Sequence, residues 1–269
     1  MTLPPARADA QVLVTGTSSG IGAEIARLLA ERGYNLAFVA RRLDRLEKLA
    51  EEFRTRYRVE VSVHARDLGN KEERRALIEE LLAAPKTVIG VCNCAGFGTS
   101  GLFHELPKER ELDEVELNVM ALVEMTHAFV GPMVKRGEGA ILNVASIASF
   151  QPLPNLATYG ATKAFVQSFS EAIQTELGGT GVSCTVLCPG PVATEWADIA
   201  NAQAVMIPGA VLQPQEVAAA AVDGFIDGKR SVVPGAVPKA LAVTGRFAPR
   251  TVLLPAMKAL PKIRRRLGR

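Results

Sequence analysis

Long apolar runs, metal-binding clusters and linkers are all missing from this sequence. No run of about eighteen apolar residues is present that could cross a membrane, and residues 1–10 lack the apolar segment of a secretory signal. The four cysteines and three histidines combine in no zinc spacing. We therefore expect a cytoplasmic protein without a metal site, whose cysteines are reduced core residues.

The 269 residues fit a single α/β domain, because no linker rich in glycine, serine or proline divides them and no segment repeats. Valine-rich apolar segments alternate with segments of helical periodicity. This alternation predicts a doubly wound parallel sheet, a Rossmann fold with helices on both faces. The predicted strands are 11–14, 35–40, 59–63, 88–92, 140–145, 182–187 and 231–233. The predicted helices are 21–33, 47–57, 71–83, 114–135, 157–177 and 214–227.

A glycine-rich turn joins the first predicted strand to the first helix. In this turn, Gly16 permits a tight bend, Gly20 lets the backbone approach a pyrophosphate, and Gly22 lets helix and sheet pack closely. The free N–H groups at the start of the helix then face the phosphates. The pattern predicts a dinucleotide site, the alternative being a plain strand-to-helix turn. The residues expected to bind the cofactor here are Gly16, Ser18, Ser19, Gly20, Ile21 and Gly22.

Two arginines follow the second predicted strand. An NAD enzyme usually carries an acidic residue near this point to bind the ribose 2′-hydroxyl, whereas this chain has Ala40 followed by Arg41 and Arg42. Guanidinium groups suit a phosphate. We therefore predict a preference for NADP(H), with Arg41 and Arg42 on the 2′-phosphate. The alternative is that they cap the next helix as solvated charges.

A tyrosine and a lysine four residues apart suggest acid–base chemistry. Tyr159 and Lys163 lie one helical turn apart on one face, and Ser146 precedes them by thirteen residues. A phenol has a pKa of about 10, which a nearby cation lowers towards the working pH. Ser146 can hold a substrate oxygen beside the phenol. Alone, such a pair is more often a packed aromatic beneath a solvated charge, and it is the dinucleotide turn that favours catalysis.

Together these residues resemble the short-chain dehydrogenase/reductase family over roughly residues 10–235. The resemblance rests on five motifs in the family's order: the glycine turn, Asp67-Leu68, Asn93-Cys94-Ala95-Gly96, the set Ser146/Tyr159/Lys163, and Pro189-Gly190 with Thr194. One departure is Cys94, where the family often has a second asparagine. The domain would span residues 1–235, with a substrate lid at about 195–212, and residues 236–269 would form a basic, apolar extension.

The resemblance also implies roles for residues around the cofactor. Asp67 and Leu68 would flank the adenine, and Asn93 would steady the central strand. The residues expected along the rest of the cofactor are Ala95, Gly96, Tyr159, Lys163, Pro189, Gly190, Val192 and Thr194.

The implied reaction is reduction of a ketone by NADPH, in which Tyr159 protonates the oxygen and Ser146 orients it. Lys163 would lower the tyrosine pKa and hold the ribose, and Asn118 would link Lys163 to solvent through water. Two alternatives stay open: oxidation of an alcohol at the same site, and a non-catalytic protein that senses NADP(H) or acts as a scaffold. The intact catalytic set argues against the last.

The substrate pocket is expected to be completed by Phe97, Leu153 and Trp196, with further apolar residues in the lid, Val205, Met206 and Ile207 among them. Apolar lining favours an apolar ketone. The segments Val232–Gly235 and Ala248–Arg250 also resemble a subgroup of reductases that act on long-chain 3-oxoacyl lipids. The same apolar lid residues could simply pack on the domain.

The C-terminal segment is strongly basic. Residues 228–269 contain eleven of the 31 Lys and Arg residues and no acidic residue, so the rest of the chain has a net charge of −8. Interleaved apolar residues suit contact with an anionic membrane on its inner, cytoplasmic face. Contact with an acidic neighbouring subunit and a solvated tail are the alternatives. Nucleic acid is not expected, because the segment has a single aromatic residue, Phe247, and no recognition motif.

Family members commonly pair through the helices predicted here at 114–135 and 157–177, which predicts a dimer or tetramer.

Overall fold

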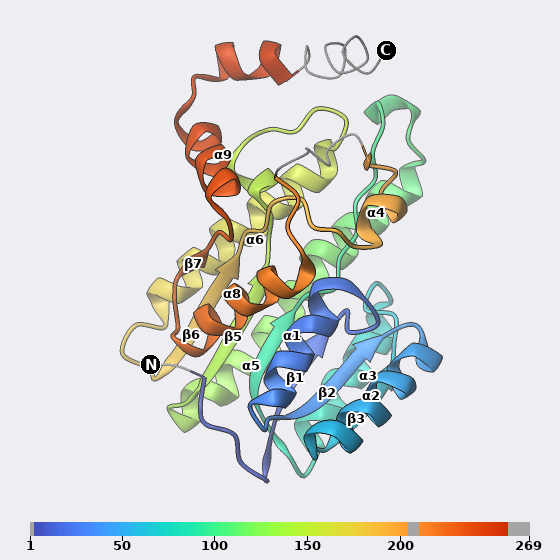
Figure 1. Cartoon of the computed structure of the whole chain (residues 1–269), viewed down its shortest axis with the longest axis vertical. Helices are drawn as coiled ribbons and strands as arrows, with labels where there is room; N and C mark the ends of the chain where they lie inside the picture. The colour runs from blue at the N-terminus through green and yellow to red at the C-terminus, as the bar shows by residue number, and fades with distance from the viewer. Residues whose placement is uncertain (1–2, 204–209, 258–269) are drawn as a thin grey trace.

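A computed structural model describes residues 3–203 and 210–257 of the chain. Its centre is a parallel sheet in the order β3-β2-β1-β4-β5-β6-β7, with helices on both faces (Figure 1). The predicted fold class is confirmed. The strands are β1 Ala10–Thr15, β2 Asn35–Ala40, β3 Val61–Ala65, β4 Thr87–Asn93, β5 Gly139–Val144, β6 Val182–Leu187 and β7 Ser231–Val232. The strand order reverses between β1 and β4, and ligands bind beyond the carboxyl ends of strands at such a point.

The helices divide between the two faces because alternate strand residues point to opposite sides. Val12 and Val14 of β1 pack with α1, α2 and α8, whereas Leu13 packs with α3 and α5. The helices are α1 Gly20–Glu31, α2 Leu43–Tyr57, α3 Lys71–Ala83, α4 Lys108–Val115, α5 Leu122–Arg136, α6 Ala157–Glu176, α7 Trp196–Ile199, α8 Pro214–Ile226 and α9 Ala236–Phe247. Short turns of 3₁₀-helix lie at η1 Phe103–Glu105 and η3 Ile147–Phe150, and the segment η2 Glu116–Ala121 is π-helical.

Most of the predicted elements are present, with shifted ends. The predictions for α3 and β6 match their observed bounds, but the strand predicted at 59–63 lies at 61–65 and α2 begins at Leu43 rather than at residue 47. The helix predicted at 114–135 begins at Lys108 and passes through the π-helical segment η2. Helix α9 was not predicted as a helix. Its only proline, Pro238, lies in the first turn, where a helix tolerates proline.

Within the described residues, one helix, Lys108–Arg136, is long and apolar enough by length and composition to cross a membrane. Core helices of globular proteins pass the same test. Its α5 part packs on β4 and β5, and Met125, Phe129 and Met133 are buried there. The packing of α5 on the sheet accounts for this composition.

Candidate active site

A single large cavity, of about 1670 Å³, opens at the carboxyl ends of the strands in the described part of the chain. It lies where the strand order reverses between β1 and β4. The residues predicted for the site that line it are Gly16, Ser18, Ser19, Gly20, Ile21, Gly22, Arg41, Arg42, Asp67, Leu68, Ala95, Gly96, Phe97, Ser146, Leu153, Tyr159, Lys163, Pro189, Gly190, Val192, Thr194 and Trp196. Asn118 does not line the cavity but bonds to Phe97, which does, whereas Asn93 bonds to Thr126 and Asn143 outside the lining.

The glycine turn has the shape that a bound pyrophosphate needs. Gly16 and Gly20 have φ values of +71° and +62°, which residues with a Cβ rarely adopt. A Cβ on Gly22 would lie 2.6 Å from the Gly16 carbonyl oxygen. The Ser19 side chain makes no capping hydrogen bond to α1, so the first N–H groups of this helix stay available to an anion. These features fit a dinucleotide cofactor.

Thr15 is a structural residue of the site that the sequence did not reveal. Its Oγ1 accepts hydrogen bonds from the N–H groups of Cys94 and Ala95, at 2.9 and 3.0 Å. The end of β1 is thereby tied to the segment after β4, along which the cofactor was predicted to lie. Asn93 ties β4 to β5, because its Nδ2 donates to Asn143 Oδ1 at 2.9 Å. The signal in the sequence that could have revealed Thr15 is its place directly before Gly16 of the glycine turn.

The two arginines after β2 differ in their contacts. Arg41 is 76% exposed in its side chain and lies 3.8 Å from Asp67 Oδ2. Arg42 donates to the hydroxyls of Ser18 and Ser19 in the glycine turn, at 2.8 and 3.0 Å. It also pairs with Glu195 at 3.0 Å. Both arginines line the cavity beside Ala40, the position at which an NAD enzyme usually carries an acidic residue.

Tyr159 and Lys163 are brought together in α6, beside Ser146 at the end of β5. The Lys163 Nζ donates to the Val144 carbonyl at 2.8 Å and lies 5.8 Å from the centroid of the Tyr159 ring. Burial raises the pKa of Tyr159 to about 12, and Glu114 adds to the rise, whereas a hydrogen bond with Ser146 acts in the opposite direction. Tyr159 is therefore a neutral phenol at pH 7 in the protein alone, able to donate a proton. Lowering of its pKa by Lys163 stays a prediction.

The Lys163 ammonium is held where water is scarce. Burial lowers the pKa of Lys163 to about 8, and the nearby Glu114 partly counteracts this fall. The group is still mostly charged at pH 7. Its cation therefore stands beside the phenol, on the side of the cavity formed by β5 and α6.

Asn118 holds the loop that carries Gly96 and Phe97. Its side chain bonds to both the N–H and the C=O of Phe97, at 3.1 and 2.9 Å, and donates to Thr162 Oγ1 at 3.1 Å. A Cβ on Gly96 would lie 2.8 Å from Asn118 Oδ1 and 3.3 Å from Lys163 Nζ. Asn118 lies in the π-helical segment η2, a distortion that often occurs at functional sites. Its predicted place in a proton relay stays a prediction.

The far end of the cavity is largely apolar. Trp196 lies against Tyr159 with ring centroids 4.8 Å apart, and Arg110 lies over the Phe97 ring at 4.6 Å. The C-terminal part of the chain supplies a wall that the sequence did not predict, made of Leu241, Thr244, Leu253 and Met257. This part includes α9, which lies at the upper left of Figure 1. The lid residues predicted at 205–207 lie outside the described residues.

The comparison with known families decides the class of protein. The model of the short chain dehydrogenase family matches residues 10–204. The chain belongs to this family. The resemblance inferred from the motifs is thus confirmed, and the protein is an oxidoreductase that works with a nicotinamide cofactor.

Individual relatives of this dehydrogenase act on very different substrates. Sulfoacetaldehyde reductase 2 of Chromohalobacter salexigens is 36% identical over 190 residues, which is 69% of this chain and 73% of that protein. A very-long-chain 3-oxoacyl-CoA reductase of Anas platyrhynchos is 31% identical over 71% of this chain and 62% of its own length. The structure of a short-chain dehydrogenase from Sphingobium yanoikuyae in complex with NADPH superposes with a TM-score of 0.80 at 32% identity, covering 88% of this chain and 92% of that one.

Proposed function

We propose that this dehydrogenase is an NADPH-dependent carbonyl reductase for an apolar, long-chain ketone of the 3-oxoacyl type. The observation that carries the proposal is the buried set Ser146, Tyr159 and Lys163 beside Gly96, with the phenol in its protonated form. A protonated phenol serves reduction, in which negative charge develops on the substrate oxygen. Hydrogen-bond donors that are preorganised around this oxygen stabilise the transition state and so lower the activation barrier.

The reaction follows from the roles of the three side chains. A bound reduced nicotinamide supplies the hydride. Ser146 Oγ holds the substrate oxygen by a hydrogen bond, and Tyr159 transfers its phenol proton to this oxygen as charge develops there. Lys163 stabilises the resulting phenolate with its positive charge. Asn118 keeps the loop of Gly96 and Phe97 in place beside Lys163.

A preference for NADP(H) over NAD(H) is supported by the surroundings of Ala40. Arg41 and Arg42 both line the cavity there, and a guanidinium binds a phosphate well. A 2′-phosphate would take its place between these two cations. The Sphingobium relative was solved with NADPH, which agrees with this preference.

The substrate class is inferred from the walls of the cavity. Its apolar residues come from three segments far apart in the sequence: Leu153 after β5, Trp196 and Ile199 in α7, and Leu253 and Met257 after α9. A small polar aldehyde would leave most of this surface without contact, whereas an acyl chain would cover it. The cavity therefore favours the long-chain substrates of the 3-oxoacyl reductases over that of the sulfoacetaldehyde reductases.

The first experiment follows NADPH oxidation by absorbance with ketones from small polar diketones to long-chain 3-oxoacyl esters, beside Tyr159→Phe. We expect turnover that rises with chain length and is lost in the variant, which keeps the ring but not the proton. Reduction of small polar ketones alone would contradict the substrate class. Full activity of Tyr159→Phe would contradict the mechanism, and tight NADPH binding without turnover would favour a cofactor-sensing protein.

The exposed face of the C-terminal segment favours contact with an anionic membrane. Phe247 and Val252 are 75% and 65% exposed, and Arg246 and Arg250 lie near them in sequence. Each basic residue near such a surface contributes about 1 kcal/mol. The basic cluster at 262–269 lies outside the described residues. We expect liposomes with anionic lipid to float the protein, and Phe247→Ser/Val252→Ser to reduce flotation. No flotation of the unaltered protein would remove this partner.

The proposed oligomer would use a different set of exposed apolar residues. Apolar side chains are exposed on η2, α5 and α6, among them Met120, Val134 and Phe165. Burial of these residues between two chains favours a dimer or tetramer. Light scattering of Phe165→Glu against the unaltered protein tests this proposal, and a monomeric unaltered protein would refute it.

A further inference from the structure

Helix α4 has its polar and apolar residues on unexpected sides. Leu112 and Val115 are exposed, at 57% and 38%, whereas Glu111 and Glu114 are buried, at 7% and 0%. A surface helix normally points its charged residues to water and its apolar residues to the core. Here α4 instead brings two carboxyl groups into the protein.

Two hydrogen bonds locate the buried acidic face. Glu111 accepts a hydrogen bond from Thr158, and Asn118 donates one to Thr162. Thr158 and Thr162 are one turn apart on α6, so the acidic face of α4 lies against α6. Glu114 lies between Glu111 and Asn118 on the same stripe of the helix. Its side chain therefore enters the contact between α4 and α6.

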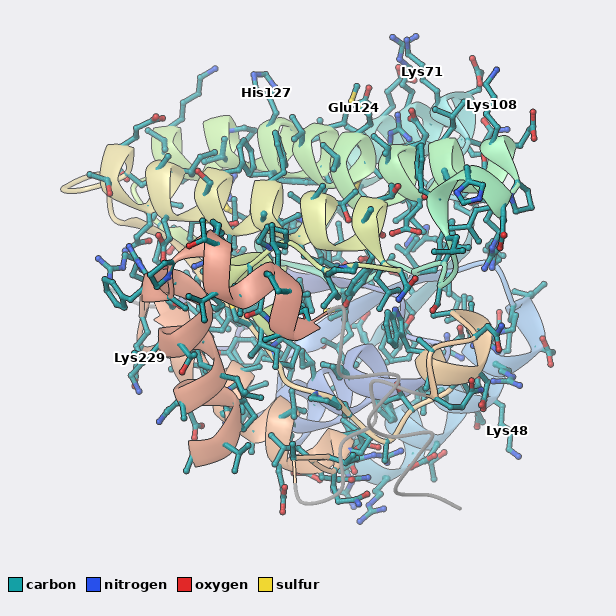
Figure 2. All side chains as sticks on the ribbon, turned by 90° about the horizontal axis from the view of Figure 1, so that it is seen from above. Lys48, Lys71, Lys108, Glu124, His127 and Lys229 are labelled. Atoms are coloured by element: carbon teal, nitrogen blue, oxygen red, sulfur yellow. The ribbon has the colours of Figure 1, made fainter. Side chains whose placement is uncertain are left out.

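The same contact holds the catalytic pair. Tyr159 and Lys163 each follow one of these threonines on α6, and both are buried. Figure 2 shows the helix that begins with α4 running beside α6 on one face of the sheet, while Lys108, Glu124 and His127 point away from it. The solvent side of this helix is thus separate from the side that carries Glu114.

The Glu114 carboxyl group faces Thr99, whose hydroxyl and N–H act to lower the pKa of Glu114. Neither Glu114 oxygen, nor Thr99 Oγ1, has a hydrogen-bond partner of normal geometry within the residues that the structure describes. The charged and titratable groups that face it are Glu111 from α4 and Tyr159 and Lys163 from α6. An isolated carboxylate at this depth would be unstable without a nearby cation, and Lys163 is the cation within reach.

The charge of Glu114 acts on the catalytic pair. Burial, followed by Glu111, raises the pKa of Glu114 to about 7, and Lys163 counteracts the rise. Once ionised, Glu114 raises the pKa of both Lys163 and Tyr159. Both effects favour the protonated form of the group concerned.

We propose that Glu114 is a positioning residue of the reaction, a buried counter-charge that keeps Lys163 as the ammonium and Tyr159 as the phenol. The site is thereby held in the state that donates a proton to the substrate oxygen. Glu114 acts through the other two residues and contacts no substrate. The inference rests on the proposed reduction at Tyr159, and it assigns α4 a part in setting the pH range of that reaction.

The test is the pH profile of ketone reduction by Glu114→Gln, which keeps the shape of the side chain and removes its charge. Reduction should fall as pH rises through the Lys163 pKa of about 8. This fall in rate is the alkaline limb of the pH profile. In Glu114→Gln we expect its midpoint to move to a pH about one unit lower, with little change in the rate near pH 6. At pH values well above the limb, turnover should be about tenfold lower than in the unaltered enzyme.

Matched variants separate charge from packing. Glu111→Gln changes a buried carboxyl group on the same face, and its alkaline limb should stay in place, because Glu111 is not among the groups that shift the Lys163 pKa. Glu114→Asp keeps the charge and should restore most of the profile. If Glu114→Gln is insoluble, Glu114→Met should show the same shift. If the pH at which reduction falls is the same in Glu114→Gln as in the unaltered enzyme while Tyr159→Phe is inactive, the role of Glu114 is wrong. If Tyr159→Phe is active, the proposed function itself is wrong.

Infrared absorption gives a readout that needs no turnover. The carboxylic acid C=O band of Glu114 should be present at low pH and disappear as pH rises through about 7, and Glu114→Gln should lack this band. Absence of any such band from the unaltered protein would refute a buried carboxyl group that titrates in this range.

Discussion

Replacing Arg41 with alanine should reduce the preference for NADPH over NADH without disturbing the rest of the site. Arg41 is well suited to this test, because its side chain is 76% exposed and its nearest ionic partner, Asp67, is 3.8 Å away. Arg42 is less suitable, since it also bonds to Ser18 and Ser19 in the glycine turn. Its loss would disturb the pyrophosphate site that NADPH and NADH share.

The expected magnitude follows from the exposure of the guanidinium. A hydrogen bond to a charged group contributes about 1.5–3 kcal/mol, and an exposed group takes the lower end of this range. A loss of about 1.5 kcal/mol is about a tenfold rise in the NADPH dissociation constant. NADH lacks the 2′-phosphate, so its dissociation constant should not change.

The assay is titration of each cofactor by calorimetry, with Arg45→Ala as the matched control. Arg45 pairs with Glu195 at 2.7 Å in the same cluster, but it does not line the cavity. Its variant should keep the ratio of the two dissociation constants. Equal weakening of NADPH and NADH in Arg41→Ala, or no change in either, would refute a contact between Arg41 and the 2′-phosphate.

Three further changes test the scaffold and the substrate wall. Thr15→Val leaves the N–H groups of Cys94 and Ala95 without their acceptor, and thermal unfolding should show a loss of about 2 kcal/mol in stability. Arg74 is buried with ion pairs to Glu116 and Glu124, whose side chains are 38% and 30% exposed and stay hydrated without it. Arg74→Ala should therefore lower the free energy of unfolding by about 1.5–3 kcal/mol in a urea titration. Leu253→Trp narrows the apolar end of the cavity, so the KM for long-chain ketones should rise while the KM for short ketones stays the same. An equal change in both KM values would contradict a substrate wall that includes Leu253.

The cofactor end could be predicted from the sequence because its constraints are local. Gly16 and Gly20 are required by backbone conformation at their own positions, and Gly22 by contact with residues six or seven before it. The catalytic pair follows in the same way, since Tyr159 and Lys163 share one helix. A spacing of four residues places two side chains on one face whatever surrounds them. Such features leave a direct pattern in the sequence.

Features that depend on distant contacts were missed. The C-terminal wall requires α9 to pack on two segments far away in the chain: a Cβ on Gly190 would lie 2.7 Å from Pro238, and one on Gly245 would lie 2.6 Å from Gln151. Helix periodicity carries no information on either contact. The sequence predicted only a basic, apolar extension at residues 236–269.

Glu114 shows why the second kind of feature matters for function. Periodicity assigns charged residues to the solvent face of a helix, and on that basis Glu111 and Glu114 would be surface residues with no part in the site. Their burial against α6 gives them a possible part in the site, because a carboxylate away from water can raise the pKa of a lysine that it faces. The residues proposed to carry out the reaction are therefore visible in the sequence, while those proposed to set its pH range and its substrate depend on the packing of α4 and α9, which only the three-dimensional structure reveals.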